Sequence, residues 1–370
     1  MTSEERRSAR RARRDAKRAE NRRRRASGCT IEAVADLDNL FEAARLASRG
    51  IRWKASVQRY MARCLANCAK SRRDLLAGRD IRMGFTRFDV FERGKLRHIS
   101  ACRFPERVIQ KSIARNALAP AIWPTLTPGC SANIKGRGVD YARRRLKRQL
   151  ASNARAHGDE RWVLLVDFSD YFGHIDHDAA RSLVRSAIDD PRIVRLMDEQ
   201  IDACGARGLG LGSETSQVLA VALPSPIDRM LEATPGIEAS GRYMDDTYAI
   251  STSKETLRGA LARTYELCEM LGIVVNPRKT RIVKLSREFS FLKRRWSIDG
   301  RRVVERPAPE AMARERRKLK RQARLVEAGA MSAEQMRRSY ASWRASVSRC
   351  RSHRSLRSMD ALYKSLTRKE

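Results

Sequence analysis

Two apolar segments that end in aspartates constrain this chain more than any other feature. Residues 162–168 form a continuous apolar run with Asp167 near its end, a pattern that predicts a buried strand. Residues 242–250 form two short β-prone runs around Asp245 and Asp246, which predict a hairpin with both acids at its turn. If the strand and the hairpin belong to one sheet, three carboxylates converge.

Converging carboxylates are suited to hold hard divalent cations, which take oxygen ligands. Two such ions about 3.5–4 Å apart activate an attacking 3′ hydroxyl and stabilise the leaving pyrophosphate when a nucleotide is added to a strand. We therefore predict that Asp167, Asp245 and Asp246 are catalytic. The same three residues, together with Phe168, are the predicted ligands of two Mg²⁺ ions, with Mn²⁺ as the alternative ion.

Charge points to the partner. The chain of 370 residues carries 78 Lys and Arg against 43 Asp and Glu, a net charge of +35. A field of this sign attracts polyanions, so nucleic acid is the predicted partner. A solubilising surface or a membrane-surface patch would need much less charge. The excess is not confined to the tails, although residues 1–25 hold twelve basic and four acidic side chains.

Composition bounds the class of protein further. An apolar content of 42% is enough for a core, and no segment approaches the ~18 consecutive apolar residues of a membrane span. No apolar segment follows the charged N-terminal residues, so no secretory signal is expected. The eight cysteines are scattered without a CxxC pair, and the five histidines show no metal-binding spacing. We expect a cytoplasmic protein with no membrane partner.

Periodicity and turn signals divide the chain. Residues 1–28 are interpreted as a solvated, disordered basic arm. Residues 81–99 predict a hairpin around a charged turn, and a helix with Pro in its first turn is expected to begin at 104–106. A basic loop at 133–138 precedes a basic helix, and the chain from Pro307 onward is predicted to be helical and strongly basic.

The residues around the acids resemble the signatures of one family. Residues 243–246 read Tyr-Met-Asp-Asp, which resembles the YxDD signature of reverse transcriptases, and residues 166–177 resemble their first catalytic motif. The resemblance implies a nucleotidyltransferase, an RNA-directed DNA polymerase that extends a primer on an RNA template. It also implies an α/β (α+β) right-hand fold with fingers, an antiparallel-sheet palm and a helical thumb. Tyr243 and Met244 would then contact the template or primer.

Flanking segments extend the resemblance across most of residues 80–300. By this resemblance, Lys95 and Arg97 belong to the fingers segment that binds the incoming triphosphate, and Lys279 lies near the leaving phosphates. For each flank taken singly, a solvated charge or a core side chain is the competing interpretation.

The segment at 291–293 is similar to the Phe-Leu-Gly turn that grips the primer in this family. Phe291 and Leu292 match it and are expected to contact the template or primer. Lys293 stands where glycine is usual, which puts the geometry of the grip in question.

The same resemblance assigns the choice of sugar to Phe172, five residues after Asp167. A ring beneath the sugar would clash with a 2′-OH, the group that distinguishes RNA from DNA. Asp170 and Tyr171 are expected to contact the triphosphate through their backbone amides. A plain core phenylalanine is the alternative for Phe172, and a core role applies equally to Tyr171.

Residues 211–217 carry a signal for the subfamily. Gly212, Ser216 and Gln217 form a Gly-x-x-x-Ser-Gln pattern where many reverse transcriptases, including those of group II introns, have Pro-Gln-Gly. The pattern is similar to the reverse transcriptases of diversity-generating retroelements, whose copying is error-prone at template adenines, although Val221 departs from the expected asparagine. Gly212 and Ser216 would contact template or primer, and Gln217 the nucleotide. A packing loop with no bearing on fidelity is the alternative.

These interpretations give four expected segments: a basic arm at 1–28, N-terminal helices and fingers at 29–160, a palm with inserted fingers helices at 161–300, and a basic helical thumb at 301–370. The predicted partners are an RNA template, a DNA or RNA primer and dNTPs, with a small basic accessory protein of the retroelement as a further candidate. Three other functions stay open: an RNA-templated RNA polymerase, a defence-associated reverse transcriptase that needs little or no template, and a catalytically silent RNA-binding scaffold.

Overall fold

The computed structural model describes residues 3–92, 95–157 and 161–367. Its central feature is an antiparallel sheet in the order β4-β5-β3-β6. The predicted buried strand is β3, and the predicted hairpin is β4–β5, which pairs directly with it. The strands are β3 (Trp162–Val166), β4 (Ala239–Tyr243), β5 (Asp246–Ser251) and β6 (Arg281–Lys284).

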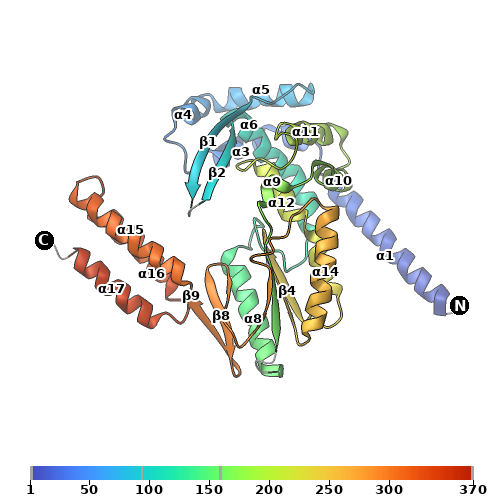
Figure 1. The fold of residues 1–370 in the computed structure, drawn as a ribbon. Coiled ribbons are helices and arrows are strands. Elements are labelled where there is room, and N and C mark those ends of the chain that lie inside the picture. Colours follow the sequence, from blue (N-terminus) through green and yellow to red (C-terminus); the bar gives the residue numbers. More distant parts are fainter. Residues whose placement is uncertain (1–2, 93–94, 158–160, 368–370) are drawn as a thin grey trace.

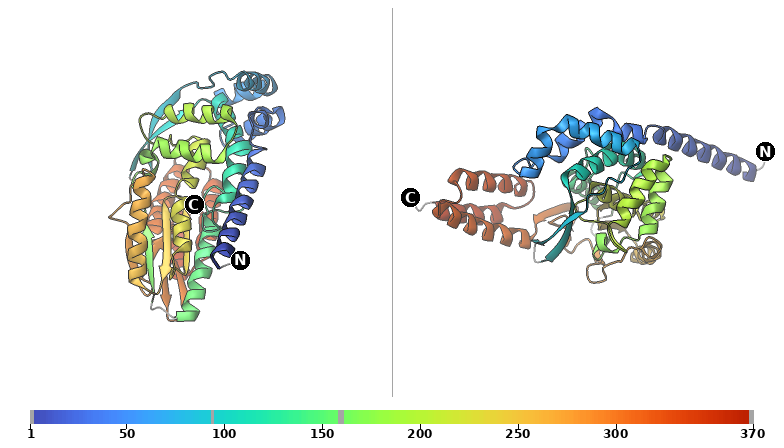
Figure 2. Two further views of the ribbon diagram at one scale, coloured as in Figure 1. Left: turned by 90° about the vertical axis from the view of Figure 1, so that its right-hand side faces the viewer. Right: turned by 90° about the horizontal axis from the view of Figure 1, so that it is seen from above.

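This sheet is covered on both faces, which explains the continuous apolar run of β3. Leu164 joins the core beneath α14 (Lys254–Met270), whereas its neighbour Val163 joins a separate core with α8 (Val139–His157). Figure 2 shows the orange α14 and the green α8 on opposite sides of the strands. An antiparallel strand with one solvated face alternates apolar and polar residues, so the uninterrupted run follows from the double cover.

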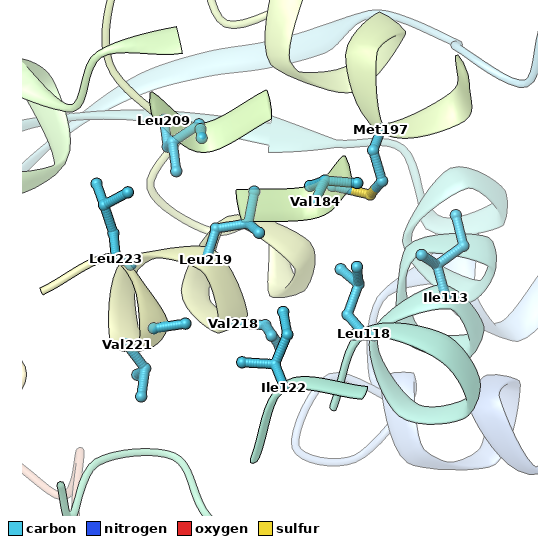
Figure 3. Close-up of a cluster of buried hydrophobic side chains, with 14 of the residues drawn as sticks. Ile113, Leu118, Ile122, Val184, Met197, Leu209, Val218, Leu219, Val221 and Leu223 are labelled. Atoms are coloured by element: carbon cyan, nitrogen blue, oxygen red, sulfur yellow. The ribbon is translucent and has the colours of Figure 1, made fainter. Parts of the chain in front are cut away.

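The largest core surrounds α12 (Glu214–Ala222), most of whose side chains are buried. Leu219 of this helix packs among side chains from α6 (Phe104–Ile113), α10 (His177–Ala187) and α11 (Pro191–Asp202) (Figure 3). Because the neighbouring helices pack tightly around α12, this helix cannot shift without disturbing the core, and its position in the molecule is fixed.

The hairpin predicted at 81–99 is formed by β1 (Phe85–Glu92) and β2 (Lys95–Cys102) in antiparallel register. It projects from the helical part of the molecule (Figure 1). Phe91 and Leu96 are exposed near its end, although both are large and apolar. The helix expected after the hairpin is α6, which has proline in its first turn as predicted.

The N-terminal segment differs from the disordered arm predicted for residues 1–28, because residues 3–26 are helical. Within them, α1 (Ser3–Ala26) is a helix that extends from the body of the protein (Figure 1). Arginine and alanine are strong helix formers, and α1 contains neither Gly nor Pro, so local propensity outweighs the density of like charge. Arg22 anchors the helix by donating to Asp189 Oδ1 at 2.5 Å and to the Ser186 carbonyl at 2.9 Å.

A second antiparallel sheet and three basic helices follow the central sheet. The helices share a small core of their own, and the helical segment expected from Pro307 onward begins at Pro309. These elements are β7 (Phe289–Phe291), β8 (Arg294–Asp299), β9 (Arg302–Pro307), α15 (Pro309–Glu327), α16 (Ala333–Val347) and α17 (His353–Thr367).

Short helices connect the larger elements. They are α2 (Ile31–Ala35), α3 (Leu37–Ala47), α4 (Ala55–Ala62), α5 (Cys64–Leu76), α7 (Ala119–Ile122), α9 (Tyr171–His174) and α13 (Ser225–Ala233), with a π-helical turn at Ala114–Leu118 and a 3₁₀ turn at Trp123–Thr125. Among the residues that the structure describes, no helix combines the length and the apolar character needed to cross a membrane.

Candidate active site

The three predicted aspartates lie at one end of the central sheet. Asp167 follows the last residue of β3, and Asp246 is the first residue of β5. In the antiparallel register Val166 pairs with Thr247. Asp167, which follows Val166, and Asp246, which precedes Thr247, are therefore neighbours at the end of the sheet. Asp245 occupies the turn just before β5.

The turn that carries Asp245 is short and strained. Tyr243 pairs with Asp246, which leaves Met244 and Asp245 as the two turn residues. Met244 has φ of 56°, in the left-handed region that side chains other than glycine rarely adopt. Two-residue hairpins favour turns with positive φ because these match the twist of the strands. The hairpin geometry therefore places Asp245 at the cost of strain in Met244.

Asp167 is held by a loop that follows α14. Lys279 Nζ contacts the two carboxylate oxygens of Asp167 at 2.7 and 2.8 Å, and Asn276 Nδ2 donates to Asp167 Oδ2 at 3.0 Å. The backbone N–H of Asn276 also donates to the Asp167 carbonyl at 2.8 Å. Lys279, predicted to lie near the phosphates, is thus brought to the acids as a positive charge.

Crowding of negative charge is visible at Asp246. Burial, with the charges of Asp245 and Asp167, raises the pKa of Asp246 to about 7, and Lys279 opposes this rise. Such a group becomes more easily ionised when a cation is supplied.

The donor set fits hard divalent ions, since three carboxylates provide oxygen ligands at one edge. Within the described part of the chain, however, no three His, Cys, Asp or Glu side chains are close enough together to enclose an ion. The ammonium group of Lys279 instead forms an ion pair with the Asp167 carboxylate. Asp167, Asp245 and Asp246 stay the predicted ligands, and an ion could bind Asp167 only if the Lys279 ammonium left that carboxylate.

A cavity of about 860 Å³ opens beside the acids. It is bounded by the end of β3, the segment that follows it, the turn at Met244 and Asp245, the loop before α12 and part of β2. The predicted site residues among its lining are Asp167, Phe168, Asp170, Tyr171, Phe172, Met244, Asp245 and Lys279. Arg207 also lines it, and it adds a positive charge that the sequence had not singled out.

Phe172 and Tyr171 differ in their surroundings. Tyr171 is buried, and its hydroxyl donates to the Ala220 carbonyl at 2.6 Å, so its side chain links the strand end to α12. Phe172 is half-buried and lines the cavity. Its carbonyl accepts from the N–H of Leu209 at 2.8 Å, and a Cβ on Gly208 would lie 2.9 Å from the same oxygen. This close approach requires glycine at 208 and fixes the backbone of Phe172.

The residues that indicated a subfamily lie outside the cavity lining. Ser216 is buried within α12. Gln217 is half-buried, and its Oε1 accepts from Asn133 Nδ2 at 3.2 Å. Gly212 has φ of 109° and lies against the β2 residue Ser100, with 3.8 Å between its ideal Cβ and that carbonyl oxygen. None of the three contacts the aspartates in the described hydrogen bonds.

A second, smaller cavity of about 240 Å³ also borders the acids. Asp246 and Lys279 line it together with Phe291, Leu292 and Lys293. The predicted grip turn and the predicted catalytic residue Asp246 therefore line the same cavity. Tyr243 is half-buried at the end of β4, next to the turn at Met244 and Asp245.

Two predicted nucleotide-binding groups cannot be placed. Lys95 and Arg97 belong to β2 by their backbone, but their side chains lie outside the described part of the structure. The cavity-lining position of Leu96 shows that this strand borders the site.

Sequence reasoning missed a buried ion pair behind the turn. Arg242 is 1% exposed and donates to both carboxylate oxygens of Asp228, at 2.8 and 2.7 Å. The available signal was an arginine inside a β-prone run, since lysine and arginine are almost never fully buried unless they are paired.

Comparison with known proteins identifies the family. A family model described as reverse transcriptase (RNA-dependent DNA polymerase) matches residues 86–293, more than half of the chain. The chain belongs to the reverse transcriptase family. This match, with an antiparallel sheet flanked by helices, confirms the predicted right-hand polymerase fold and the predicted enzyme class. Reverse transcriptase domains use divalent metal ions, in agreement with the carboxylate donors.

Two solved structures have partial similarity. Apo telomerase from Candida tropicalis truncated from its C-terminal domain is 15% identical, over 60% of this chain and 54% of that chain, with a TM-score of 0.47. Apo telomerase from Candida tropicalis is 13% identical, over 60% and 48%, with a TM-score of 0.46. This reverse transcriptase therefore spans about half the length of the chains it matches. A search of curated proteins found no match.

Proposed function

We propose that this reverse transcriptase adds dNTPs to the 3′ end of a primer on an RNA template, by phosphoryl transfer assisted by two Mg²⁺ ions. The observation that carries the proposal is the position of Asp167, Asp245 and Asp246 at one end of the sheet, beside a cavity of about 860 Å³. Bound divalent ions would supply charge stabilisation for the attacking and leaving oxygens.

The chain's own residues would orient the substrates. Lys279 can exchange the Asp167 carboxylate for a phosphate oxygen, because an ammonium ion pairs with either anion. Arg207 adds a second positive charge on the cavity wall. Phe172, whose backbone Leu209 and Gly208 fix, is proposed to lie beneath the sugar and to exclude a 2′-OH.

Template and primer are proposed to enter between the hairpin β1–β2, the acids and the grip turn. Phe291 and Leu292 line the smaller cavity together with Asp246, where a primer end would need support. Lys95 and Arg97 on β2 are proposed to assist in binding the triphosphate. The proposed division is an arm at 1–28, fingers to 160, a palm to 300 and a thumb to 370.

The test is the loss of catalysis without loss of binding. Asp167→Asn or Asp245→Asn should reduce dNTP incorporation by at least ~10³-fold, about 4 kcal/mol of transition-state stabilisation, while RNA binding stays close to wild type. Asp178→Asn is the matched control, because that carboxylate is 91% exposed and lies outside the site. Near-normal extension by either site variant would contradict the proposal.

The same assay separates the other functions. Preference for rNTPs would indicate an RNA polymerase, and synthesis without template would indicate the defence-associated type. Wild-type protein that binds RNA without any nucleotide transfer would indicate a scaffold.

We further propose a diversity-generating retroelement as the biological setting. The supporting observation is the Gly-x-x-x-Ser-Gln pattern at 212–217, which begins beside β2 and leads into the enclosed α12. A small basic accessory protein is a proposed partner. The eight cysteines are free, which suits a reducing cytosol. Misincorporation concentrated opposite template adenines would support this setting, and uniform fidelity across the four template bases would contradict it.

A further inference from the structure

The end of α12 leaves backbone carbonyls without helical partners. Pro224 has no N–H, so it cannot donate to the Ala220 carbonyl four residues earlier. That carbonyl instead accepts the Tyr171 hydroxyl at 2.6 Å, and the next carbonyl, of Val221, accepts Arg242 Nη2 at 2.8 Å. One side chain comes from the segment after β3 and the other from β4. The end of α12 is therefore bonded to β4 and to the segment that follows β3, both of which lie next to the three aspartates.

Arg242 forms hydrogen bonds to two backbone carbonyls in addition to its ion pair with Asp228. Its guanidinium donates to both oxygens of Asp228 on α13, to the Val221 carbonyl and to the Met244 carbonyl, the last at 3.1 Å. Met244 is the first residue of the catalytic turn. A planar guanidinium with five donors in a fixed geometry can hold several acceptors at defined angles, whereas the ammonium of lysine cannot.

The backbone of Arg242 is held as firmly as its side chain. Its N–H donates to the Gly129 carbonyl at 3.0 Å, and its carbonyl accepts from the N–H of Ser131 at 3.0 Å. A Cβ on Gly129 would lie 3.3 Å from the Cα of Gly241, so the two segments are in close contact. The residue two positions before the turn is thus fixed on every side.

The strained backbone of Met244 is an independent reason to expect that hydrogen bonds such as those from Arg242 hold the turn in place. With φ of 56° it occupies a region that costs energy for a residue with a side chain. Strained backbone persists where the surroundings over-determine it, and it is concentrated at functional sites. The contact from Arg242 to the Met244 carbonyl lies at this strained peptide.

We propose that Arg242 and Asp228 are positioning residues for the catalytic turn. Asp228 neutralises and orients the Arg242 guanidinium, which fixes the Met244 carbonyl and so the direction in which Asp245 points. The pair also ties the turn to α12, so that a shift of this helix is transmitted to the acids. This inference rests on the proposed polymerase function for its kinetic test.

A purely structural role is the competing explanation, and the pair's burial alone does not decide between them. Replacing a buried ion pair by apolar residues of similar shape is often neutral or stabilising, whereas removing one partner leaves an uncompensated charge. The double variant Arg242→Met with Asp228→Leu is therefore the informative one. It keeps an apolar, filled site and removes the contacts to Met244 and Val221.

Arg161→Met with Glu238→Leu is a control at the far end of the same sheet, with a more exposed carboxylate, since the Glu238 side chain is 30% exposed and that of Asp228 is 6% exposed. Arg161 is 1% exposed and forms an ion pair with Glu238. It immediately precedes β3, on the opposite end from Asp167.

Each variant would be measured for thermal unfolding, for affinity toward an RNA–DNA primer-template, for single-turnover dNTP addition and for Mn²⁺ binding by electron paramagnetic resonance. The Arg242–Asp228 double variant should fold and bind primer-template as wild type does. It should add dNTPs at least ~10²-fold more slowly, the size of effect that a displacement of about 1 Å can cause, with little change in KM for dNTP and with weaker Mn²⁺ binding. Arg242→Lys should recover only part of the rate. The Arg161–Glu238 control should retain the wild-type rate per folded molecule.

Wild-type rate and Mn²⁺ affinity in the Arg242–Asp228 double variant would overturn the proposal, as would an equal loss in the control. If the double variant does not fold, Arg242→Lys decides, because it keeps the charge. A full wild-type rate for Arg242→Lys would then reject the positioning role. Absence of nucleotide addition by the wild type would reject the polymerase function instead, while the comparison of Mn²⁺ binding would still test the positioning role.

Discussion

At the scale of single residues, Phe172 is the side chain proposed to choose the sugar. Phe172→Ala would open space for a 2′-OH and leave the aspartates in place. Discrimination against rNTPs should fall by ~10²-fold or more, at 1.4 kcal/mol per decade, while DNA synthesis persists. The measurement is the ratio of kcat/KM for dTTP over UTP on one RNA template.

Tyr171→Phe is the control for this ratio, since it removes only the hydroxyl that bonds to the Ala220 carbonyl. It should lower stability and leave the ratio unchanged. If Phe172→Ala reduces both rates equally, the ring is a core residue and the gate must be sought elsewhere on the cavity wall.

Asp246 leads to a prediction about pH in the metal-free protein. Its pKa is raised to about 7, well above the value of a free carboxyl, so ionising it destabilises the folded state as pH rises from about 4 to about 7. In EDTA at pH 8, Asp246→Asn should therefore be more stable than wild type, by about 1 kcal/mol or more. The gain should vanish below about pH 4, where both side chains are neutral.

Thermal unfolding from pH 4 to 8 measures this difference. Adding Mg²⁺ at pH 8 should stabilise the wild type more than the variant, because the ion favours the ionised carboxylate. Parallel stability curves in EDTA would show that burial and the neighbouring carboxylates do not raise the pKa of Asp246 in the folded protein.

At the scale of elements, the β7–β8 turn shows how a departure from the family pattern is accommodated. Phe291 pairs with Arg294, so Leu292 and Lys293 form a two-residue turn with φ of 50° and 62°. Such a turn is the favoured connection of a hairpin, and glycine fits it without strain. Lys293 adopts a left-handed backbone that glycine would adopt without strain, so the two-residue turn forms although lysine stands where glycine is usual in the family.

Lys293→Gly should therefore stabilise the protein. Relief of left-handed strain is worth ~1–2 kcal/mol and the added entropy of an unfolded glycine costs ~0.4–1 kcal/mol, which leaves a net gain of up to about 1.6 kcal/mol. Lys284→Gly in β6 is the opposite case, because glycine in a strand interior costs ~0.5–1 kcal/mol. Chemical denaturation compares the two, and a loss of stability in Lys293→Gly would show that the lysine side chain contributes more than its backbone costs.

Features that depend on neighbouring residues in the sequence can be predicted, whereas contacts between distant segments cannot. The strand β3 and the hairpin β4–β5 are predicted correctly, because an apolar run and a turn between β-prone runs are local patterns. The disorder predicted for residues 1–28 is not found in α1, because the helix propensity of arginine and alanine outweighs the repulsion between like charges. The links from Arg242 to Val221 and Asp228 could not be predicted, since they join elements that only the tertiary fold brings together.

At the scale of the whole molecule, basic charge lies at both ends of the structure. The helix α1 and the helices α15–α17 extend from opposite sides of the body (Figure 1), and each of these regions is rich in arginine. A duplex bound at the acids and supported by α15–α17 would lie away from α1. We therefore expect α1 to contact phosphates of RNA beyond the primer-template duplex.

This arrangement gives the final prediction, which concerns salt dependence. Each phosphate contact releases counterions and steepens the fall of log affinity with log salt by ~0.9 for duplex DNA and ~0.7 for single strands. Removing residues 1–28 should flatten that slope on a long structured RNA and leave it nearly unchanged on a short primer-template. Extension of the short primer should continue, because α1 lies outside the cavity that the acids border.

Replacing Arg6, Arg7, Arg11 and Arg13 by Gln, which preserves helix propensity, should reproduce most of the change and so separate the effect of charge from that of the helix itself. An unaltered slope on the long RNA would show that α1 does not contact nucleic acid, and the same flattening on both substrates would place it on the primer-template duplex instead.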